Sequence, residues 1–314
     1  MPRVGVNGVP LHFERSGAGE PLLLITGFTI SAAVFEPVLE LYGGRFDCIT
    51  YDNCGSGRSG APLLPTSMAE LAADAAGLLR AIGVESAHVC GLSMGGMIAQ
   101  ELAIRFPDRV RGLVLGCTSH GGPRAVLPSP KVAAALGARG APADLRVQLV
   151  GRALFSEQFR TREPALSRRY LGLLAAHRTS ARGLMSHLAA STYHDTRARL
   201  GRIAAPTLVI HGDRDALTPP ANARLLAAAI PDATLALVPG AGHGYLLEQP
   251  ELSHRLFLDW LRPRSPVPPG PALSGLAARS EPLTRHLGLP VGMLRTARSL
   301  TAVPGPPPVS PGRR

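Results

Sequence analysis

The sequence predicts an α/β fold with one mostly parallel sheet, helices on both of its faces and a helical insertion. Short apolar runs that end in glycine-containing loops alternate with helical patterns up to about residue 120. Arg- and Ala-rich helical patterns then replace this alternation, which resumes at residue 207. Strands that alternate with helices form parallel strands joined by crossover helices. The predicted parts are an N-terminal core (1–120), a helical cap (121–200), a C-terminal core (201–262) and a tail (263–314).

The N-terminal core is predicted to begin with a hairpin over residues 4–14, because Asn7-Gly8 supplies the positive φ angles of a tight turn. The continuous apolar run Leu22-Leu23-Leu24-Ile25 is typical of a strand that is buried on both faces. Ser67 and Glu70 have the spacing of a capping box, which starts a helix that runs to about residue 82. The remaining elements predicted here are strands at 46–51, 87–90 and 110–116 and helices at 34–41 and 94–106.

The cap and the C-terminal core differ in their patterns. In the cap, helical patterns cover residues 144–154 and 162–176, and strand-like runs are missing. The C-terminal core returns to alternation. Its predicted elements are strands at 207–210 and 234–238 and helices at 221–230 and 250–260.

The tail has a composition of its own. It contains twelve prolines, and seven arginines against a single acid, Glu281. Such a segment cannot bury enough apolar surface to offset its ordering entropy, so it is expected to be largely disordered. More than half of the net charge of +11 lies in the tail, and aromatic residues make up only 4% of the chain. No basic run is interleaved with aromatic side chains, so nucleic acid is not an expected partner.

The chain is expected to work in the cytoplasm. It contains no run of about 18 apolar residues, which a membrane span requires. The N-terminal segment 1–7 becomes polar before the apolar region of a signal peptide could form. The four cysteines include no C-x-x-C pair and do not make a disulfide framework in a chain of this length. Three of them fall in predicted strands, where buried, reduced thiols are expected. The sequence carries no signal of oligomeric state.

One serine lies among three glycines in the segment Cys90-Gly91-Leu92-Ser93-Met94-Gly95-Gly96. A nucleophilic serine must leave its strand on a sharp turn, so that Oγ is accessible and the next helix directs its amide end at the reacting atom. Glycines two residues before and two residues after the serine permit a backbone approach at which a Cβ would clash. With a strand before it and a helix after it, this G-x-S-x-G pattern predicts a nucleophile elbow.

Two later loops supply an acid and a base. The strand at 207–210 is followed by Gly212-Asp213-Arg214-Asp215, and the strand at 234–238 is followed by Gly242-His243. Both loops, like Ser93, follow strands of one parallel sheet and therefore meet at one edge of it. The order serine, acid, histidine fits a catalytic triad.

From about residue 8 to residue 262 the chain resembles the α/β-hydrolase superfamily. The resemblance rests on the elbow, on Tyr51-Asp52-Asn53-Cys54-Gly55-Ser56-Gly57, on the loop from Gly212 to Pro219, and on His243 followed by Glu248 and Pro250. The elbow is most similar to that of the enol-lactone hydrolases of aromatic degradation and related esterases. Two loops depart from the family pattern, which puts their geometry in question: Thr26-Gly27 replaces the common His-Gly, and Cys54 replaces the usual Arg.

The resemblance implies a role for each matched residue. Ser93 would be the nucleophile, His243 the general base and acid, and Asp215 the carboxylate that holds the imidazole tautomer. Asp215 is assigned because it fits the family spacing G-x-x-D-x-x-x-P, and Asp213, two residues earlier, remains the alternative acid. The backbone N–H groups of Phe28 and Met94 would form the oxyanion hole.

The other candidate ligands are weaker. His120 lies at the start of the insertion and is predicted to contact substrate. His177, His187 and His194 lie on insertion helices and are expected to be solvated. No His, Cys or carboxylate pair has the spacing of a metal site, and the glycines at 55–60 lack the helix of a dinucleotide fingerprint. Neither a metal nor a cofactor is therefore predicted.

These residues predict a serine hydrolase that cleaves a small carboxylic ester or lactone through an acyl-enzyme, chemistry that needs no cofactor. A serine at the elbow argues against epoxide hydrolases and haloalkane dehalogenases, which need a carboxylate nucleophile there. Carbon–carbon bond hydrolases, cofactor-free haloperoxidases and acyltransferases share the triad and remain alternatives, as does a ligand receptor that retains the fold. The substrate pocket is expected to be lined from residues 120–200, which carry no motif.

Overall fold

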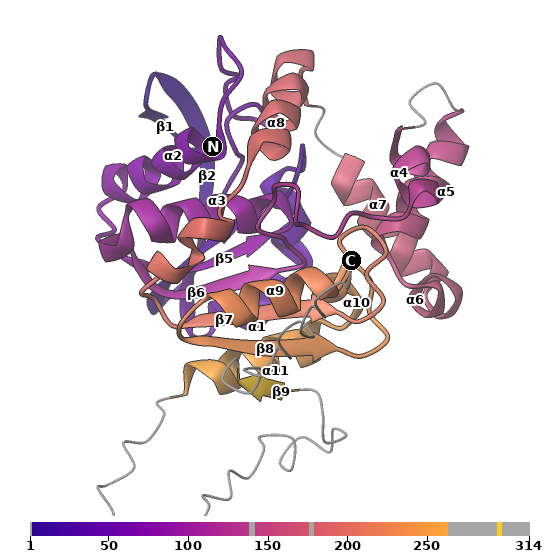
Figure 1. Cartoon of the computed structure of the whole chain (residues 1–314). Helices are drawn as coiled ribbons and strands as arrows, with labels where there is room; N and C mark the ends of the chain where they lie inside the picture. The colour runs from indigo at the N-terminus through magenta and orange to yellow at the C-terminus, as the bar shows by residue number, and fades with distance from the viewer. Residues whose placement is uncertain (1, 138–141, 176–178, 263–293, 297–314) are drawn as a thin grey trace, which may run out of the picture.

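A computed structural model describes residues 2–137, 142–175, 179–262 and 294–296 and builds them around one central sheet (Figure 1). In this part of the chain the sheet has nine strands, in the order β1-β2-β4-β3-β5-β6-β7-β8-β9. The six strands from β4 to β8 in that order run parallel, while β1, β2 and β9 pair antiparallel at the two edges. The predicted mostly parallel α/β sheet is confirmed. The strands are β1 (Arg3–Val6), β2 (Val9–Gly17), β3 (Glu20–Ile25), β4 (Phe46–Tyr51), β5 (Ala87–Leu92), β6 (Val110–Gly116), β7 (Thr207–Gly212), β8 (Ala233–Val238) and β9 (Leu294–Thr296).

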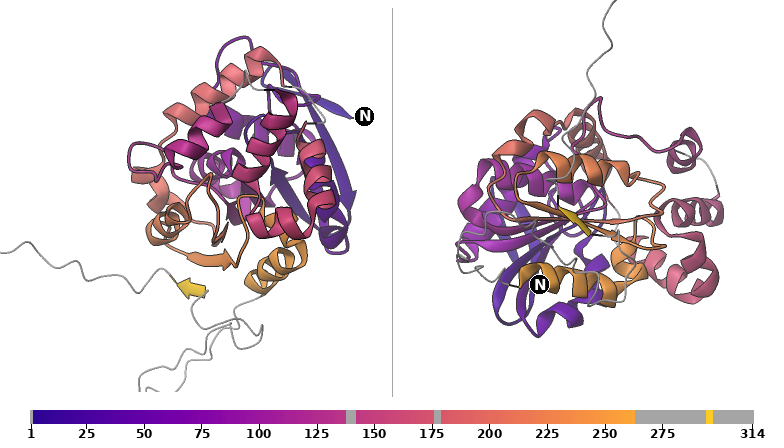
Figure 2. Two further views of the ribbon diagram at one scale, coloured as in Figure 1. Left: turned by 90° about the vertical axis from the view of Figure 1, so that its right-hand side faces the viewer. Right: turned by 60° about the horizontal axis from the view of Figure 1, so that its bottom comes forward.

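Helices cover both faces of the sheet, which explains why its central strands are apolar without alternation (Figure 2). On β3, Leu22 and Leu24 belong to one apolar core, and Leu23 and Ile25 belong to the other. The first core includes helices α1 (Glu36–Gly43), α10 (Tyr245–Glu248) and α11 (Pro250–Leu261). The second includes α2 (Met68–Ala81), α3 (Met94–Arg105) and α9 (Ala221–Ala229).

Local sequence signals set several helix ends. The capping box at the start of α2 is formed: the Ser67 hydroxyl accepts from the Glu70 N–H at 3.2 Å, and the Glu70 carboxylate accepts from the Ser67 N–H at 2.7 Å. The predicted helix at 162–176 is wrong in its start, because α6 (Glu157–Arg162) ends before Pro164, where a new helix begins. Short 3-10 turns at Ala32–Phe35, Pro107–Arg109 and Arg197–Arg202 complete the elements.

The segment between β6 and β7 holds five helices in the part that the structure describes. They lie as two groups, with α4 to α7 beside the carboxyl edge of the sheet and α8 apart from them (Figure 1). The two ends of the segment meet, since Gly121 bridges Asp195 and the Thr196 N–H donates to the His120 carbonyl at 2.9 Å. The helices are α4 (Pro130–Gly137), α5 (Ala143–Leu154), α6, α7 (Pro164–Ala175) and α8 (Ala181–Tyr193).

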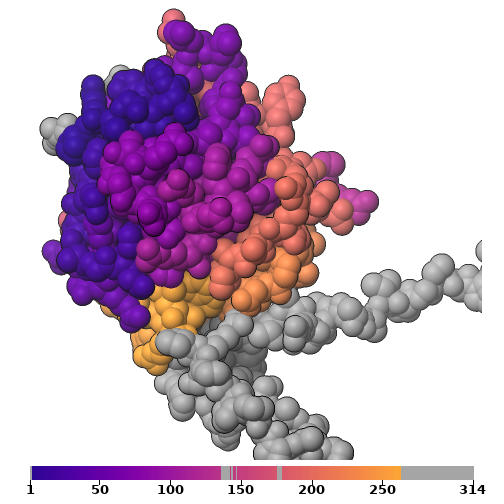
Figure 3. All heavy atoms as spheres, turned by 90° about the vertical axis from the view of Figure 1, so that its left-hand side faces the viewer, coloured from indigo at the N-terminus to yellow at the C-terminus, as the bar shows by residue number. Residues whose placement is uncertain are grey.

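The N-terminal and C-terminal core parts form one body. In the space-filling view of the side opposite α4 to α7, N-terminal residues cover most of the face and C-terminal residues close its lower edge (Figure 3). All four cysteines are free and buried, whereas burial was predicted for only three of them. Among the described residues, no helix has the length and hydrophobicity of a membrane span.

One short part of the tail belongs to the sheet. Leu294–Thr296 form β9, which pairs antiparallel with residues 234–236 of β8. The expectation of a largely disordered tail did not include this strand. For residues 263–293 and 297–314 the expectation falls outside the described part of the chain.

Candidate active site

Ser93 occupies a strained turn between β5 and α3. Its backbone has φ 56° and ψ −120°, a left-handed conformation that side chains rarely adopt. The flanking glycines are required by close packing: a Cβ on Gly91 would lie 2.2 Å from the Gly95 carbonyl oxygen, and a Cβ on Gly95 would lie 2.2 Å from the Ile25 carbonyl oxygen. The Ser93 N–H donates to the Gly116 carbonyl at 2.8 Å. The turn thus has the geometry of a nucleophile elbow.

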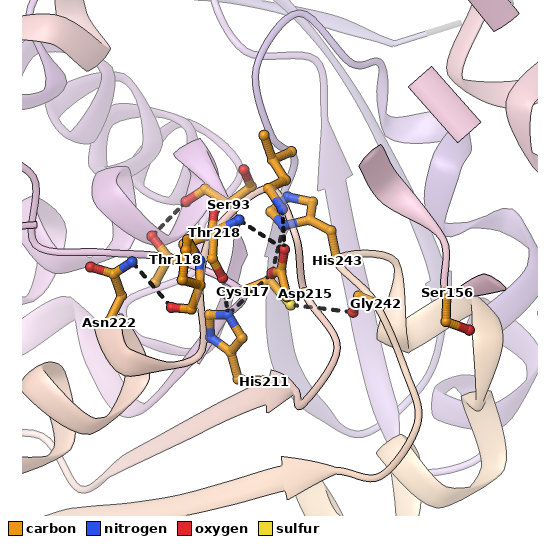
Figure 4. A network of polar contacts seen from close by, with 12 residues as sticks. Ser93, Cys117, Thr118, Ser156, His211, Asp215, Thr218, Asn222, Gly242 and His243 are labelled. Carbon is orange, nitrogen blue, oxygen red and sulfur yellow. Dashed lines mark hydrogen bonds and ion pairs between the residues drawn. The ribbon is translucent and has the colours of Figure 1, made fainter. Parts of the chain in front are cut away.

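Asp215 and His243 form a hydrogen-bonded pair at the same edge of the sheet (Figure 4). The distance from His243 Nδ1 to Asp215 Oδ2 is 2.8 Å. The other carboxylate oxygen, Oδ1, accepts from the N–H groups of Leu217 and Thr218 at 2.9 and 2.8 Å. Because Asp215 is ionised and accepts from Nδ1–H, the Nε2 of neutral His243 carries the free lone pair that a general base needs.

A second histidine also contacts Asp215. His211, at the end of β7, lies with Nε2 at 3.1 Å from Asp215 Oδ2 and 2.7 Å from the Thr218 carbonyl oxygen. Since a carbonyl can only accept, Nε2 carries the proton. Burial alone would raise the pKa of Asp215, but the neighbouring His243 and His211 hold it well below its usual range. Asp215 therefore stays ionised, stabilised by the two histidines and by the N–H groups of Leu217 and Thr218.

Asp213 lies outside this network. Its carboxylate accepts from the Gly240 N–H at 2.7 Å and lies 3.8 Å from the Arg214 side chain. It fixes the turn after β8, while the carboxylate that contacts His243 belongs to Asp215. The family spacing favoured Asp215 and left Asp213 as the alternative, and the structure places Asp215 against His243 and Asp213 against Gly240.

The loop after β3 holds Phe28, and the start of α3 holds Met94, the two predicted oxyanion donors. A Cβ on Gly27 would lie only 3.3 Å from the Ser93 Cβ, so this loop packs directly against the elbow. Met94 is the first residue of α3, where a helix leaves its N–H unpaired. Thr26, which replaces the family's common histidine, is held by Asn53, whose Nδ2 donates to the Thr26 carbonyl at 3.1 Å and lies 3.2 Å from Thr26 Oγ1. Hydrogen bonds from Asn53 thus hold Thr26 in this loop.

His187 of α8 joins the cap to this loop, and the sequence analysis missed it. Its Nδ1 accepts from the Thr29 N–H at 3.2 Å and its Nε2 donates to the Cys54 carbonyl at 2.8 Å, so the neutral ring bridges two loops. The ring also lies edge-on to Phe28, with centroids 6.1 Å apart. Burial lowers the pKa of His187, which favours this neutral form. The expectation that His187 and His194 are solvated is wrong, because both side chains are buried at the root of the cap.

A half-buried carboxylate joins the cap to the histidine loop on the other side of the site. Glu248 Oε1 accepts from the N–H groups of Gly242 at 2.9 Å and Ser156 at 3.1 Å, and Oε2 accepts from the Ser156 hydroxyl at 2.5 Å. The Gly244 N–H donates to the Leu154 carbonyl at 2.8 Å. These bonds attach residues 154–156 of the cap to the loop that carries His243.

Ser93 and His243 open into a common cavity of about 70 Å³. Its walls come from the loop after β3, from cap residues and from α10, and His120 is not among them. His120 is buried beside the start of the cap, and neither of its ring nitrogens has a hydrogen-bond partner among the described residues. His120 therefore lies outside the set of residues that line this cavity.

Cys117 is the remaining reactive group at this cavity. Together with Asp215 and His243 it makes the one group of potential metal ligands in the described residues, with ligand atoms within 4.8 Å of one another. Burial raises the pKa of the Cys117 thiol, so it stays protonated. The other two residues already share a hydrogen bond. The arrangement thus suits a triad better than a metal centre.

The family model of the alpha/beta hydrolase fold matches residues 20–250. The chain belongs to the α/β-hydrolase family. The match spans both core parts and the cap between them, and it agrees with the elbow, the sheet order and the acid–histidine pair described above. This chain is therefore a hydrolase of the alpha/beta hydrolase fold.

Several known proteins are similar to this hydrolase. A putative carbamate hydrolase RutD of Azorhizobium caulinodans is 33% identical over 261 residues, which cover 82% of this chain and 97% of the relative. A pimeloyl-[acyl-carrier protein] methyl ester esterase of Chromobacterium violaceum is 33% identical over 256 residues, with 78% and 93% covered. The solved enol-lactonase of Burkholderia xenovorans LB400 superposes with a TM-score of 0.73 at 28% identity and covers 83% of this chain and 99% of its own.

Proposed function

We propose that this hydrolase cleaves a carboxylic ester or lactone through an acyl-enzyme formed on Ser93. The observation that carries the proposal is the 2.8 Å hydrogen bond from His243 to Asp215 at a cavity that also exposes the elbow serine. A histidine held in this tautomer can accept the proton of a serine hydroxyl, which makes the serine a nucleophile at neutral pH.

In the acylation half, Ser93 Oγ attacks the carbonyl carbon while its proton moves to His243 Nε2. The resulting oxyanion is stabilised by the N–H groups of Phe28 and Met94. When the tetrahedral intermediate collapses, the bond to the leaving oxygen breaks and His243 Nε2–H returns the proton to that oxygen. An alcohol leaves from an ester, whereas a lactone keeps its new hydroxyl on the acyl group.

In the deacylation half, water takes the place of the alcohol. His243 accepts a proton from the water, and the hydroxide oxygen attacks the acyl carbon. Collapse of the second intermediate returns the proton to Ser93 and releases the acid. Asp215 stabilises the imidazolium that forms in each half, and its low pKa keeps it ionised throughout.

The relatives support this reaction class. Two of them are named for ester or lactone cleavage, the methyl ester esterase and the enol-lactonase. The carbamate hydrolase is named for a related group, whose carbonyl carbon is bonded to a nitrogen where that of an ester is bonded to a carbon. All three substrate types carry a carbonyl that a serine can attack.

The test is hydrolysis of p-nitrophenyl butyrate by the full-length protein and by Ser93→Ala. Loss of the nucleophile should lower kcat by a factor of about 10⁴ or more. Ser86→Ala, which changes a serine at the opposite end of β5, is the matched control and should retain full activity. Several turnovers per chain would distinguish an enzyme from a receptor that is acylated once, and unchanged activity of Ser93→Ala would refute the proposal.

A further inference from the structure

The cavity at Ser93 is apolar. Its wall includes Ile30, Val34, Phe35, Phe155 and Leu174. Among the described residues that line it there is no Lys, Arg, Asp or Glu. Part of the wall consists of side chains that are almost fully buried, with Phe35 at 0% and Cys117 at 1% exposure.

From this cavity we infer a substrate class: esters or lactones whose acyl part is short and uncharged, with about two to four carbons. The inference rests on the proposed acyl-enzyme mechanism. The cavity of about 70 Å³ is less than half of the roughly 150 Å³ that holds a benzene ring in an apolar protein interior. A short aliphatic chain fits this space, while a long chain would have to displace packed walls.

The cavity lining also disfavours substrates with a negatively charged acyl group. A carboxylate on the acyl group would lose its hydration in the cavity and find no cation on the described walls. Asp215, which is hydrogen-bonded to His243 at this cavity, is ionised and would repel it. Substrates that carry an acid on the acyl side are therefore excluded.

The buried part of the wall assigns the cavity to the acyl group rather than to the alcohol. The alcohol of an ester must leave while the acyl group is still bound to Ser93, and a leaving group cannot depart through the core. The acyl group stays in place until water releases it. A space lined by buried core side chains next to the serine therefore suits the part that remains on the enzyme.

The cavity wall is anchored and cannot widen freely. Phe155 lies between Leu154, which accepts from the Gly244 N–H, and Ser156, which donates to Glu248. A Cβ on Gly244 would lie 2.5 Å from the Phe155 ring, so this ring already fills the space against the histidine loop. The wall and His243 thus form a single packed unit, which gives the cavity a fixed length.

The first experiment measures kcat/KM for p-nitrophenyl acetate, butyrate, octanoate and hemisuccinate. Acetate and butyrate should differ by less than tenfold, and octanoate and hemisuccinate should each be at least 100-fold slower than butyrate. Hemisuccinate has the same number of acyl carbons as butyrate, so that pair isolates the charge. Equal rates for octanoate, or for hemisuccinate, would overturn the inference. In a series of alkyl acetates the rates should vary less than tenfold, and a sharp length limit there would assign the cavity to the alcohol instead.

The second experiment enlarges the wall. Leu174→Ala should raise the octanoate-to-butyrate ratio of kcat/KM at least tenfold, because it removes a side chain that lines the cavity. Leu171→Ala is the matched control on the same helix, α7. The Leu171 side chain packs against the apolar core but does not line the cavity, so the ratio should stay unchanged. An equal ratio in Leu174→Ala and the wild type would contradict the inference. If Ser93→Ala retained butyrate turnover, the acyl-enzyme mechanism itself would be refuted. If Ser93→Ala were inactive but the wild type cleaved octanoate and hemisuccinate as fast as butyrate, the mechanism would stand and the inferred substrate class would be refuted.

Discussion

The core and the cap contribute to the same site in different ways. The core supplies the proposed reacting groups, each directly after a parallel strand: Ser93 after β5, Asp215 after β7 and His243 after β8. The cap supplies contacts that hold loops of the core: His187 binds the loops after β3 and β4, and residues 154–156 bind the loop that carries His243. Packing differs as well, since Leu22 and Leu23 of β3 are 0% exposed while Leu188 and Met185 of α8 are 44% and 58% exposed.

This difference separates two kinds of effect. A change at a core loop alters the atoms that move protons or carry charge, so it should lower kcat strongly. A change in the cap alters the position of a core loop or of the cavity wall. It should therefore lower kcat moderately and change the selectivity for the acyl chain more. A change at the outer edge of the sheet should affect neither.

Asp215→Asn should produce the largest effect, a drop in kcat of about 10³ to 10⁴, because an amide neither stabilises the imidazolium nor holds the same tautomer. The measurement is p-nitrophenyl butyrate turnover at pH 8. Asp213→Asn is the matched control from the same loop and should change kcat by less than about threefold, because Asp213 binds Gly240 and not His243.

The same pair of variants tests the charge on Asp215. Its pKa is lower in the folded protein than the usual value of about 3.9, so the ionised form contributes stability above that pH and the contribution is lost as the pH falls below it. In denaturant titrations between pH 5 and pH 3, Asp215→Asn should lose less stability than the wild type. A steeper loss in the variant would contradict the assigned direction of the pKa shift.

His187→Ala should have an intermediate effect, with kcat for p-nitrophenyl butyrate lowered about tenfold and KM changed less. It removes the partner of the Thr29 N–H and so loosens the loop that carries the Phe28 oxyanion donor, and complete loss of one such donor costs about 10² to 10³. His187→Gln, which can accept and donate at similar positions, should recover most of the rate.

Leu188→Ala, at the next and more exposed position of α8, serves as the cap control and should keep wild-type kcat. If Leu188→Ala and His187→Ala were equally slow at equal melting temperature, a general loosening of α8 rather than the His187 contacts would explain the result. If His187→Gln were as slow as His187→Ala, hydrogen bonding by this side chain would not be its role.

Truncation after Arg264 should produce the smallest effect. It removes β9, which pairs with residues 234–236 of β8, away from the end of β8 that leads to His243. We expect kcat/KM within about twofold of the full-length value and a melting temperature a few degrees lower, because an edge strand contributes little beyond its own pairing. A tenfold loss of kcat/KM would show that the tail supports the site.

Much of the core could be predicted from the sequence because its signals are local. Each parallel strand is a short apolar run that ends at a glycine-containing loop, and this pattern needs no knowledge of partners. The elbow could be predicted for the same reason, since its backbone conformation requires glycine at positions fixed relative to Ser93. The capping box of α2 is equally local.

The cap contacts could not be predicted, because they join residues that are far apart in the chain. His187 binds the Cys54 carbonyl across 133 positions, and Ser156 binds Glu248 across 92. Nothing near His187 in the sequence distinguishes a bridging histidine from a solvated one, and this is why the solvated assignment was wrong. The helical patterns predicted α5 and α7, but they could not predict which loops these helices contact.

The sequence by itself determined the order of the parallel strands and of the core helices that join them, the strained turn at Ser93 and the two loops that carry acid and histidine, because backbone sterics and apolar periodicity act over a few residues. Only the tertiary structure decided that Asp215 rather than Asp213 contacts His243, that His187 holds the loop of Phe28, and that the cavity behind Ser93 is short and uncharged. Each of these depends on the direction of side chains from separate elements, which is set when the elements pack together.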